Sequence, residues 1–201
     1  MRISLIGAGG IGSNLGVHLA KMGATNLTVY DDDTVETHNI SNQFYPISAI
    51  GKPKVEALKS MIEFMEGVSI LAINSKFDPD LDSSEILIAC VDSMSAREEI
   101  YKSVKNLYGL KWFIDCRMGA NAGDISFVPN TEDGWARYEA NFFSDDKAEP
   151  VPCTARSTIY APSAISAFVC EFIGRMSMDD VENKFSQTLF NIKANWVGKR
   201  K

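Results

Sequence analysis

The sequence predicts an α/β fold with a mostly parallel sheet, because short apolar segments alternate with segments of helical periodicity. The first apolar segment, residues 2–6, runs through a glycine turn into an amphipathic segment at 10–22. Near the middle of the chain, two apolar segments flank RMGANAG, a turn-forming stretch typical of a hairpin. We therefore expect a sheet that starts parallel, has antiparallel strands in its C-terminal half, and carries helices on both faces.

The remaining elements follow from the same periodicities. Residues 130–152 are polar and aperiodic, and we interpret them as a mobile surface loop. No internal repeat, low-complexity tract or linker divides the chain, so we expect one domain over residues 1–201. The expected strands are 2–6, 26–30, 68–73, 85–90, 111–116, 124–129 and further strands within 186–197; the expected helices are 10–22, 53–65, 94–107 and 158–176.

Composition limits the partners and the location of the protein. The formal net charge is −6, which disfavours a nucleic-acid-binding surface. No apolar run approaches the ~18 residues of a membrane span, so no membrane partner is expected. The four cysteines form no C-x-x-C pair, and a reduced, cytoplasmic protein is the simplest interpretation.

The stretch GAGGIG at residues 7–12 follows the first strand and opens the first helix. In a Rossmann-like unit Gly7 allows a tight turn, Gly9 lets the backbone approach a phosphate, and Gly12 lets the helix pack close to the strand. The N-terminus of that helix presents free N–H groups to an anion. The context predicts nucleotide binding, although a glycine-rich turn alone also serves tight packing.

Two charged positions have competing interpretations. Asp31 ends the second strand 19 residues after Gly12, about where a dinucleotide fold places the acid that binds a ribose. Alternatively, Asp31 to Asp33 form a solvated turn. Lys54 lies in the first turn of a helix, where the helix dipole disfavours a cation, so it is either paired with an anion or a solvated surface lysine.

Asp92 follows the fourth strand at its carboxyl end, where ligands bind in open α/β sheets. Its alternative role is that of an ordinary N-cap for the following helix, and Ser93 or Ser95 are further candidates for that cap.

Four ordered blocks together resemble the ThiF/MoeB/E1 superfamily of ATP-dependent adenylyltransferases. GAGGIGS at 7–13 is similar to the nucleotide loop of that family, and DDDTVETHNISNQ at 31–43 to its D-x-D-x-V-x-x-x-N-x-x-x-Q block. GKPK at 51–54 resembles its G-x-x-K segment, and VDSMSAR at 91–97 its metal-binding block. The resemblance covers roughly residues 1–175.

The resemblance implies an ATP- and Mg²⁺-dependent reaction. The C-terminal carboxylate of a small ubiquitin-like or sulfur-carrier protein, or of a peptide, would attack the α-phosphorus of ATP and release pyrophosphate. It also implies a homodimer. The implied nucleotide contacts are Gly7, Gly9, Gly10 and Gly12, with Asp31 and Asp33 near the ribose, Asn39, Asn42, Gln43 and Lys54 near the phosphates, and Asp92 as the metal ligand.

The resemblance assigns a possible second step to Cys153. A family cysteine at this place, just before a large helix, can receive the acyl group as a thioester. Cys153 and Arg156 lie close in sequence at the expected helix N-terminus, a setting that lowers a thiol pKa. The alternative is an inert loop thiol.

Three features depart from the family pattern. The arginine-bearing helix that often precedes the first strand has no counterpart in these residues, Asn42 stands where an arginine is usual, and the zinc-binding C-x-x-C pairs are missing. An arginine finger contributes about 10³–10⁵ in rate in other phosphoryl-transfer enzymes. Candidate replacements are Arg97, Arg117, Arg156 and Lys52.

Two other functions therefore stay open. The chain could be a nucleotide-binding but catalytically weak partner subunit of a heteromeric E1-like enzyme, or an NAD-dependent oxidoreductase that uses GAGGIG and Asp31.

Overall fold

The computed structural model describes residues 1–105, 107–119, 121–142 and 159–200. These residues form one eight-stranded sheet in the order β3-β2-β1-β4-β5-β6-β7-β8. The strands are β1 (Ile3–Ile6), β2 (Leu27–Tyr30), β3 (Leu71–Ile73), β4 (Ile86–Ala89), β5 (Trp112–Met118), β6 (Ala122–Pro129), β7 (Ser186–Asn191) and β8 (Trp196–Arg200).

The sheet is parallel from β3 to β5 and antiparallel from β5 to β8, as expected. Consecutive strands β1, β2 and β3 progress in one direction from β1, whereas β4 pairs on the other side of β1. The strand order therefore reverses between β1 and β4. Ligands of open α/β sheets bind at this kind of switch point, outside the carboxyl ends of the strands.

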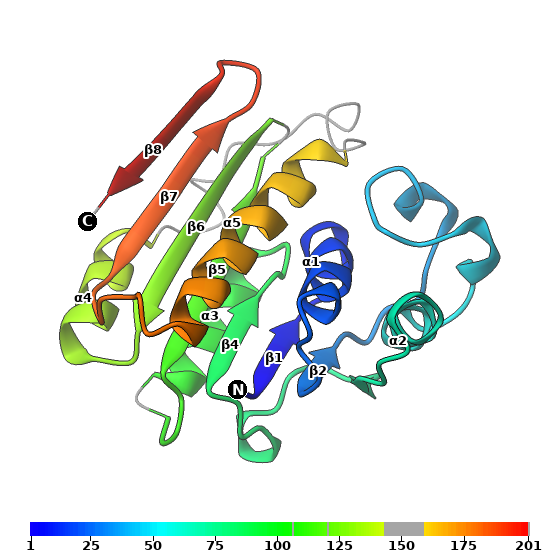
Figure 1. Cartoon of the computed structure of the whole chain (residues 1–201), viewed down its shortest axis with the longest axis horizontal. Helices are drawn as coiled ribbons and strands as arrows, with labels where there is room; N and C mark the ends of the chain where they lie inside the picture. Colours follow the sequence, from blue (N-terminus) through cyan, green and yellow to red (C-terminus); the bar gives the residue numbers. More distant parts are fainter. Residues whose placement is uncertain (106, 120, 143–158, 201) are drawn as a thin grey trace.

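Helices cover both faces of the sheet (Figure 1). On one face lie α1 (Gly10–Lys21), α2 (Lys54–Glu66) and α5 (Tyr160–Ser177); on the other lie α3 (Met94–Val104) and α4 (Glu132–Ala140). Short 3-10 helices η1 (Thr37–Asn39), η2 (Ile47–Ala49) and η3 (Pro79–Leu81) lie in the connections. None of the helices in the described residues is long and apolar enough to cross a membrane.

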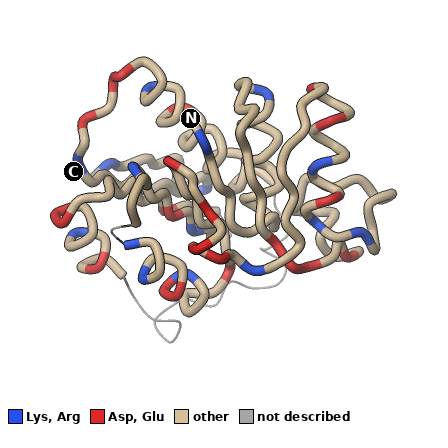
Figure 2. The backbone as a smooth tube through the Cα atoms, turned by 90° about the horizontal axis from the view of Figure 1, so that it is seen from below, with Lys and Arg blue, Asp and Glu red and all other residues tan. Residues whose placement is uncertain are grey.

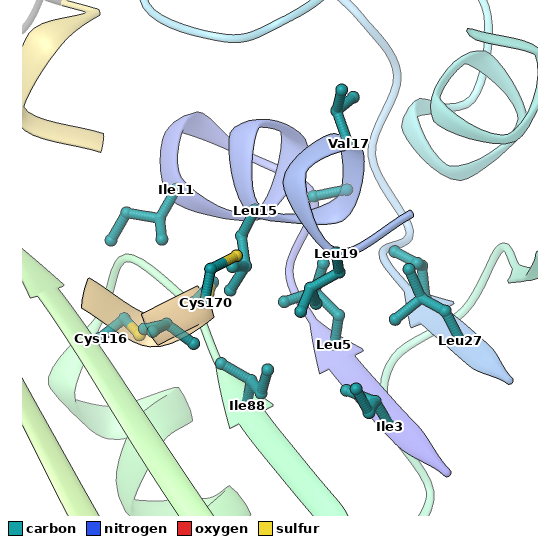
Figure 3. Packing of buried hydrophobic residues seen from close by; sticks show 14 of the residues in the cluster. Ile3, Leu5, Ile11, Leu15, Val17, Leu19, Leu27, Ile88, Cys116 and Cys170 are labelled. Carbon is teal, nitrogen blue, oxygen red and sulfur yellow. The ribbon is translucent and has the colours of Figure 1, made fainter. Parts of the chain in front are cut away.

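The two faces of the sheet bury separate apolar clusters. Leu5 and Ile88 pack with Leu15 and Leu19 of α1 in the larger cluster (Figure 3). The smaller cluster joins the opposite face to Tyr101 of α3 and to the side chains of α4. Central strands buried on both faces read as continuous apolar runs, which explains why strands such as ILIA are apolar at every position.

The structure describes three of the four cysteines. Cys90, Cys116 and Cys170 are buried free thiols. Cys116 and Cys170 pack in the core beside α1 (Figure 3). Cys153 lies outside the described residues.

The expectation of a loop over 130–152 is wrong in its first part, because α4 occupies Glu132–Ala140. Thr131 caps this helix by accepting from the Gly134 N–H at 3.1 Å. Trp135 and Tyr138 are fully buried one helical turn apart. Gly134 obscured the periodicity, yet it is needed there, since a Cβ would lie 2.4 Å from the carbonyl oxygen of Pro129.

Smaller differences concern the ends of elements. The third helix ends at Val104 rather than 107, Pro53 precedes α2 as its N-cap, and β8 extends beyond residue 197 to Arg200. Acidic and basic residues are interspersed along the described backbone (Figure 2).

Gly12 supplies a stability prediction. A Cβ at Gly12 would lie 1.8 Å from the carbonyl oxygen of Gly7, so Gly12→Ala must displace backbone. We expect a loss of about 3 kcal/mol in the free energy of unfolding, measured by urea denaturation. The matched control is Gly174→Ala in α5, where the new Cβ meets only the Met22 side chain at 3.6 Å. That control should be neutral or stabilising by up to about 1 kcal/mol, and equal losses in both variants would contradict the close-approach argument.

Candidate nucleotide site

The glycine loop after β1 has a backbone that side chains would prevent. Gly7 has a φ of +91°, and a Cβ there would lie 2.9 Å from the carbonyl oxygen of Cys90 at the end of β4. Gly9 is the N-cap of α1 and has open space within 4 Å of its Cβ position. No side chain of the described residues caps this helix end. The uncapped N–H groups are therefore open to an anion.

Two side chains hold the loop at Ala8. Asp31 Oδ2 accepts from the Ala8 N–H at 2.6 Å, and the buried Tyr45 hydroxyl donates to the Ala8 carbonyl oxygen at 2.7 Å. Asp31 Oδ1 accepts from the Asp33 N–H at 2.9 Å. The Asp31 side chain is 9% exposed, so it is no part of a solvated turn. Each of its oxygens keeps a second lone pair for a hydroxyl donor.

Lys54 is a buried cation at the first position of α2. The residue is 7% exposed, which rules out the solvated-lysine alternative. Its Nζ lies 2.6 Å from Asp33 Oδ2 and 3.8 Å from Asp31 Oδ1. The Lys54 N–H also donates to the Asp33 carbonyl oxygen at 2.9 Å, which fastens the start of α2 to the end of the acidic run. Asp33 and Asp31 of the chain itself therefore offset the charge of Lys54, and a role of Lys54 toward an anionic ligand stays a prediction.

The segment from Asn39 to Gln43 lies against the start of α1. Asn39 is buried, and its Oδ1 accepts from the Glu36 N–H at 2.8 Å in a capping box around η1. The carbonyl oxygen of Asn42 lies 3.5 Å from the Cβ position of Gly10. Gln43 Oε1 is buried and has no hydrogen-bond partner among the described residues. Such an orphaned polar atom calls for a partner, which a bound ligand can supply.

Asp92 follows β4 on the strand next to the glycine loop. Ser93 is the N-cap of α3 and accepts from the Ala96 N–H at 3.2 Å, so the cap interpretation of Asp92 is wrong. Asp92 is exposed, and none of the described residues engages its carboxylate. The described part of the chain holds no cluster of three or more metal-ligating side chains. Asp92 would nevertheless suffice as a protein ligand for Mg²⁺, because this ion is usually bound through one or two carboxylates together with substrate phosphates.

Two of the candidate replacement cations are engaged with Asp115 in β5. Arg97 in α3 donates to the Asp115 carboxylate, and Arg117 Nε donates to Asp115 Oδ2 at 2.7 Å. Burial opposes the charge of Arg117, but Asp115 and Tyr138 outweigh it and raise the pKa of Arg117. Lys52 is exposed, and Arg156 lies outside the described residues.

Sequence reasoning missed Asp115, although a signal exists. An acid inside the apolar strand FID must be buried, and a buried carboxylate needs a cationic partner nearby.

Some of the site residues expected from the sequence are in direct contact in the structure, and others lie nearby. Asp31, Asp33, Lys54 and the glycine loop are in direct contact, and the segment from Asn39 to Gln43 adjoins the loop. Asp92 lies at the end of the neighbouring strand. The uncapped helix end and the buried cation fit a nucleotide phosphate chain, and Asp92, whose carboxylate no described residue engages, lies close enough in the fold to serve as a ligand of a phosphate-bound cation.

Comparison with known proteins matches this chain to a protein family. The profile of the ThiF family matches residues 1–196. Over 106 residues the chain is 39% identical to the NEDD8-activating enzyme E1 catalytic subunit of Arabidopsis thaliana, which covers 50% of the chain and 23% of that protein. It is 28% identical over 138 residues to the molybdopterin-synthase adenylyltransferase of Haemophilus influenzae, covering 65% and 57%.

Solved structures share the fold. PaaA superposes with a TM-score of 0.77 at 19% identity, covering 100% of the chain and 63% of that protein. The E. coli MccB structure with ATP gives a TM-score of 0.69 at 15% identity, covering 99% and 63%. The chain spans less than two thirds of the length of each of these relatives.

Asp31 supplies the second prediction. In Asp31→Asn the amide NH₂ must face either the Ala8 or the Asp33 N–H, so one buried hydrogen bond is lost and Lys54 loses a charge partner. We expect about 2 kcal/mol less stability in urea denaturation. Asp32→Asn, at the exposed neighbour, should stay within about 0.5 kcal/mol of the parent. An Asp31→Asn protein as stable as the Asp32→Asn protein would show that the carboxylate does not hold the loop.

Proposed function

We propose that this chain, which belongs to the ThiF family of E1-like adenylyltransferases, activates the C-terminal carboxylate of a small protein or peptide by adenylylation with ATP. The observation that carries the proposal is the combination at the β1/β4 switch point. Lys54 is buried beside Asp31 near the uncapped end of α1, and Asp92, just after the adjacent strand β4, presents a carboxylate that none of the described residues engages.

The reaction requires positioning and charge stabilisation rather than a general base. The attacking carboxylate is already ionised at neutral pH. One of its oxygens bonds to the α-phosphorus, the bond from that phosphorus to the bridging oxygen breaks, and pyrophosphate leaves with the electron pair. Lys54 and the N–H groups of the glycine loop would offset the negative charge that gathers on the phosphates.

The remaining site residues have distinct proposed roles. Asp31 would accept from ribose hydroxyls with its free lone pairs, and the buried Gln43 Oε1, which has no hydrogen-bond partner among the described residues, would accept from a donor on the nucleotide, while the Gln43 NH₂ would be the group that donates to the phosphates. Asp92 would hold Mg²⁺, which would supply positive charge to offset the negative charge of the phosphates. The side chain of Asp33 is 68% exposed. Water can therefore solvate this carboxylate if Lys54 leaves it to pair with a phosphate.

The relatives support the substrate class. The similar Arabidopsis thaliana protein is a NEDD8-activating subunit, and E. coli MccB has been solved with both ATP and MccA. A carrier protein or peptide with a free C-terminal carboxylate is therefore proposed for this chain. A homodimer in the cytoplasm is part of the same proposal, and light scattering tests the dimer.

Pyrophosphate exchange with a candidate carrier protein or peptide tests the activity. Asp92→Asn should lower the Mg²⁺-dependent exchange rate by about 10²-fold or more, because the metal loses its protein ligand. Asp80→Asn, an exposed acid of η3 in the connection before β4, is the matched control and should keep the parent rate. An absence of exchange, together with no binding of Mg·ATP in calorimetry, would refute the proposal.

A second candidate is the catalytically weak partner subunit, because Arg97 and Arg117 are engaged with Asp115 and Asn42 replaces an arginine. Robust turnover by the single chain that disappears in Asp92→Asn would exclude this candidate. The oxidoreductase alternative is tested by thermal shift, since stabilisation by NAD and not by Mg·ATP would favour it.

The proposed acyl transfer to Cys153 rests on the family resemblance alone. Cys153→Ala should keep pyrophosphate exchange at the parent rate and lose any thioester adduct, seen by mass spectrometry as a reductant-sensitive mass increase. Cys170→Ala, at a buried core position, should keep the adduct. An adduct that persists in Cys153→Ala would assign the covalent step to another residue.

A further inference from the structure

Arg97 has an unusual position for a cation. It lies in the first turn of α3, and its N–H donates to the Ser93 carbonyl oxygen at 3.2 Å. The positive end of the helix dipole disfavours a cation there. Arg97 is nevertheless only 3% exposed. A buried arginine at this end of a helix needs specific acceptors to offset both costs.

Those acceptors come from the turn after β4 and from the middle of β5. Arg97 Nη2 donates to the carbonyl oxygen of Val91, directly after β4. Arg97 Nη1 donates to the Asp115 carboxylate and, at 3.1 Å, to the Cys116 carbonyl oxygen in β5. The guanidinium thus joins the turn after β4 to the neighbouring strand.

Asp115 orients this guanidinium. The carboxylate is fully buried, with one oxygen facing Arg97 and the other accepting from Arg117 Nε and from the Tyr138 hydroxyl at 2.9 Å. Its position in β5 is fixed by the ladder to β6, where it faces Ser126. Arg97 is therefore held against a rigid part of the sheet.

The backbone around Asp92 is restrained on both sides. Val91 is held through its carbonyl oxygen by Arg97, and Ser93 is held by its capping bond to the Ala96 N–H. The Asp92 side chain makes no hydrogen bond or ion pair among the described residues. Its direction is consequently set by the backbone of its two neighbours.

We propose that Arg97, oriented by Asp115, is a positioning residue that fixes the backbone at Val91 and thereby aims the Asp92 carboxylate at the nucleotide-bound metal ion. This inference rests on the proposed function, because it needs Asp92 to be a metal ligand. In this proposal Arg97 acts through Asp92 rather than on the nucleotide, because its guanidinium is engaged with Asp115, Cys116 and Val91.

The experiment measures metal linkage rather than turnover. Calorimetry gives the affinity for the non-hydrolysable analogue AMPCPP in the presence and absence of Mg²⁺, for the parent and for Arg97→Lys. Lysine keeps the charge, but it lacks the planar guanidinium that lets Arg97 donate to the Val91 carbonyl oxygen and to the Asp115 carboxylate at once. We expect the Mg²⁺ enhancement to fall at least tenfold, while the affinity in metal-free buffer stays within about twofold of the parent.

Tyr138→Phe is the matched control. It removes one hydrogen bond from Asp115 and leaves the Arg97 contact to Val91 intact, so it should lower the melting temperature and keep the Mg²⁺ enhancement. If Arg97→Lys does not fold, Asp115→Asn gives the second measurement, because it leaves Arg97 in place without its carboxylate and should also reduce the enhancement.

Three results would each overturn the inference. The first is an unchanged Mg²⁺ enhancement in Arg97→Lys, and the second is a loss of metal-free affinity in that variant as large as its loss of enhancement. The third is a loss of enhancement in Tyr138→Phe as large as that in Arg97→Lys. Asp92→Asn separates the two levels of the argument. If Asp92→Asn keeps the enhancement, the metal role in the proposed function fails. If Asp92→Asn loses it and Arg97→Lys keeps it, only the positioning role is wrong.

Discussion

The candidate site depends on one steric constraint, the close approach of α1 to the end of β1. The Cβ position of Gly12 lies 1.8 Å from the Gly7 carbonyl oxygen, and that of Gly7 lies 2.9 Å from the Cys90 carbonyl oxygen. Only a chain without side chains at these points can bring the helix end, the loop and β4 together. The uncapped N–H groups, the Asp31 contact to Ala8 and the proximity of Asp92 all follow from that packing.

Two buried cations near the glycine loop, Lys54 and Arg97, have similar positions and partners. Lys54 opens α2 and Arg97 lies in the first turn of α3, so both stand where a helix disfavours positive charge. Each is compensated by a carboxylate from a neighbouring part of the sheet, Asp33 in the loop after β2 for Lys54 and Asp115 in the middle of β5 for Arg97. The difference is exposure, since Asp33 faces solvent and Asp115 is fully buried. Lys54 can thus exchange partners at modest cost, whereas Arg97 is fixed.

The sequence predicted the sheet, its change from parallel to antiparallel strands, and the presence of Asp31 and Lys54 near the glycine loop. These features could be predicted because each has a local signal in the sequence. Apolar runs, a glycine turn and spaced blocks are all readable along the chain. The helix α4 was missed because Gly134 interrupts its apolar stripe, and Gly134 is there for a contact with Pro129, a partner that periodicity does not reveal. Asp115 was missed because its partners, Arg97 and Tyr138, come from separate helices. The roles of individual site residues rest on a bound nucleotide, which no local pattern describes.

The pairing of β1 with β4 determines when the candidate site forms during folding. Ile6 pairs with Ala89, so the two halves of the switch point are brought together by a contact distant in sequence. Such nonlocal contacts form only after a large loop has closed. During synthesis the glycine loop, Asp31 and Lys54 emerge well before Asp92. A nascent chain that ends before β4 would therefore hold the glycine loop without Asp92, and the proposed nucleotide site would be complete only once the central sheet has closed.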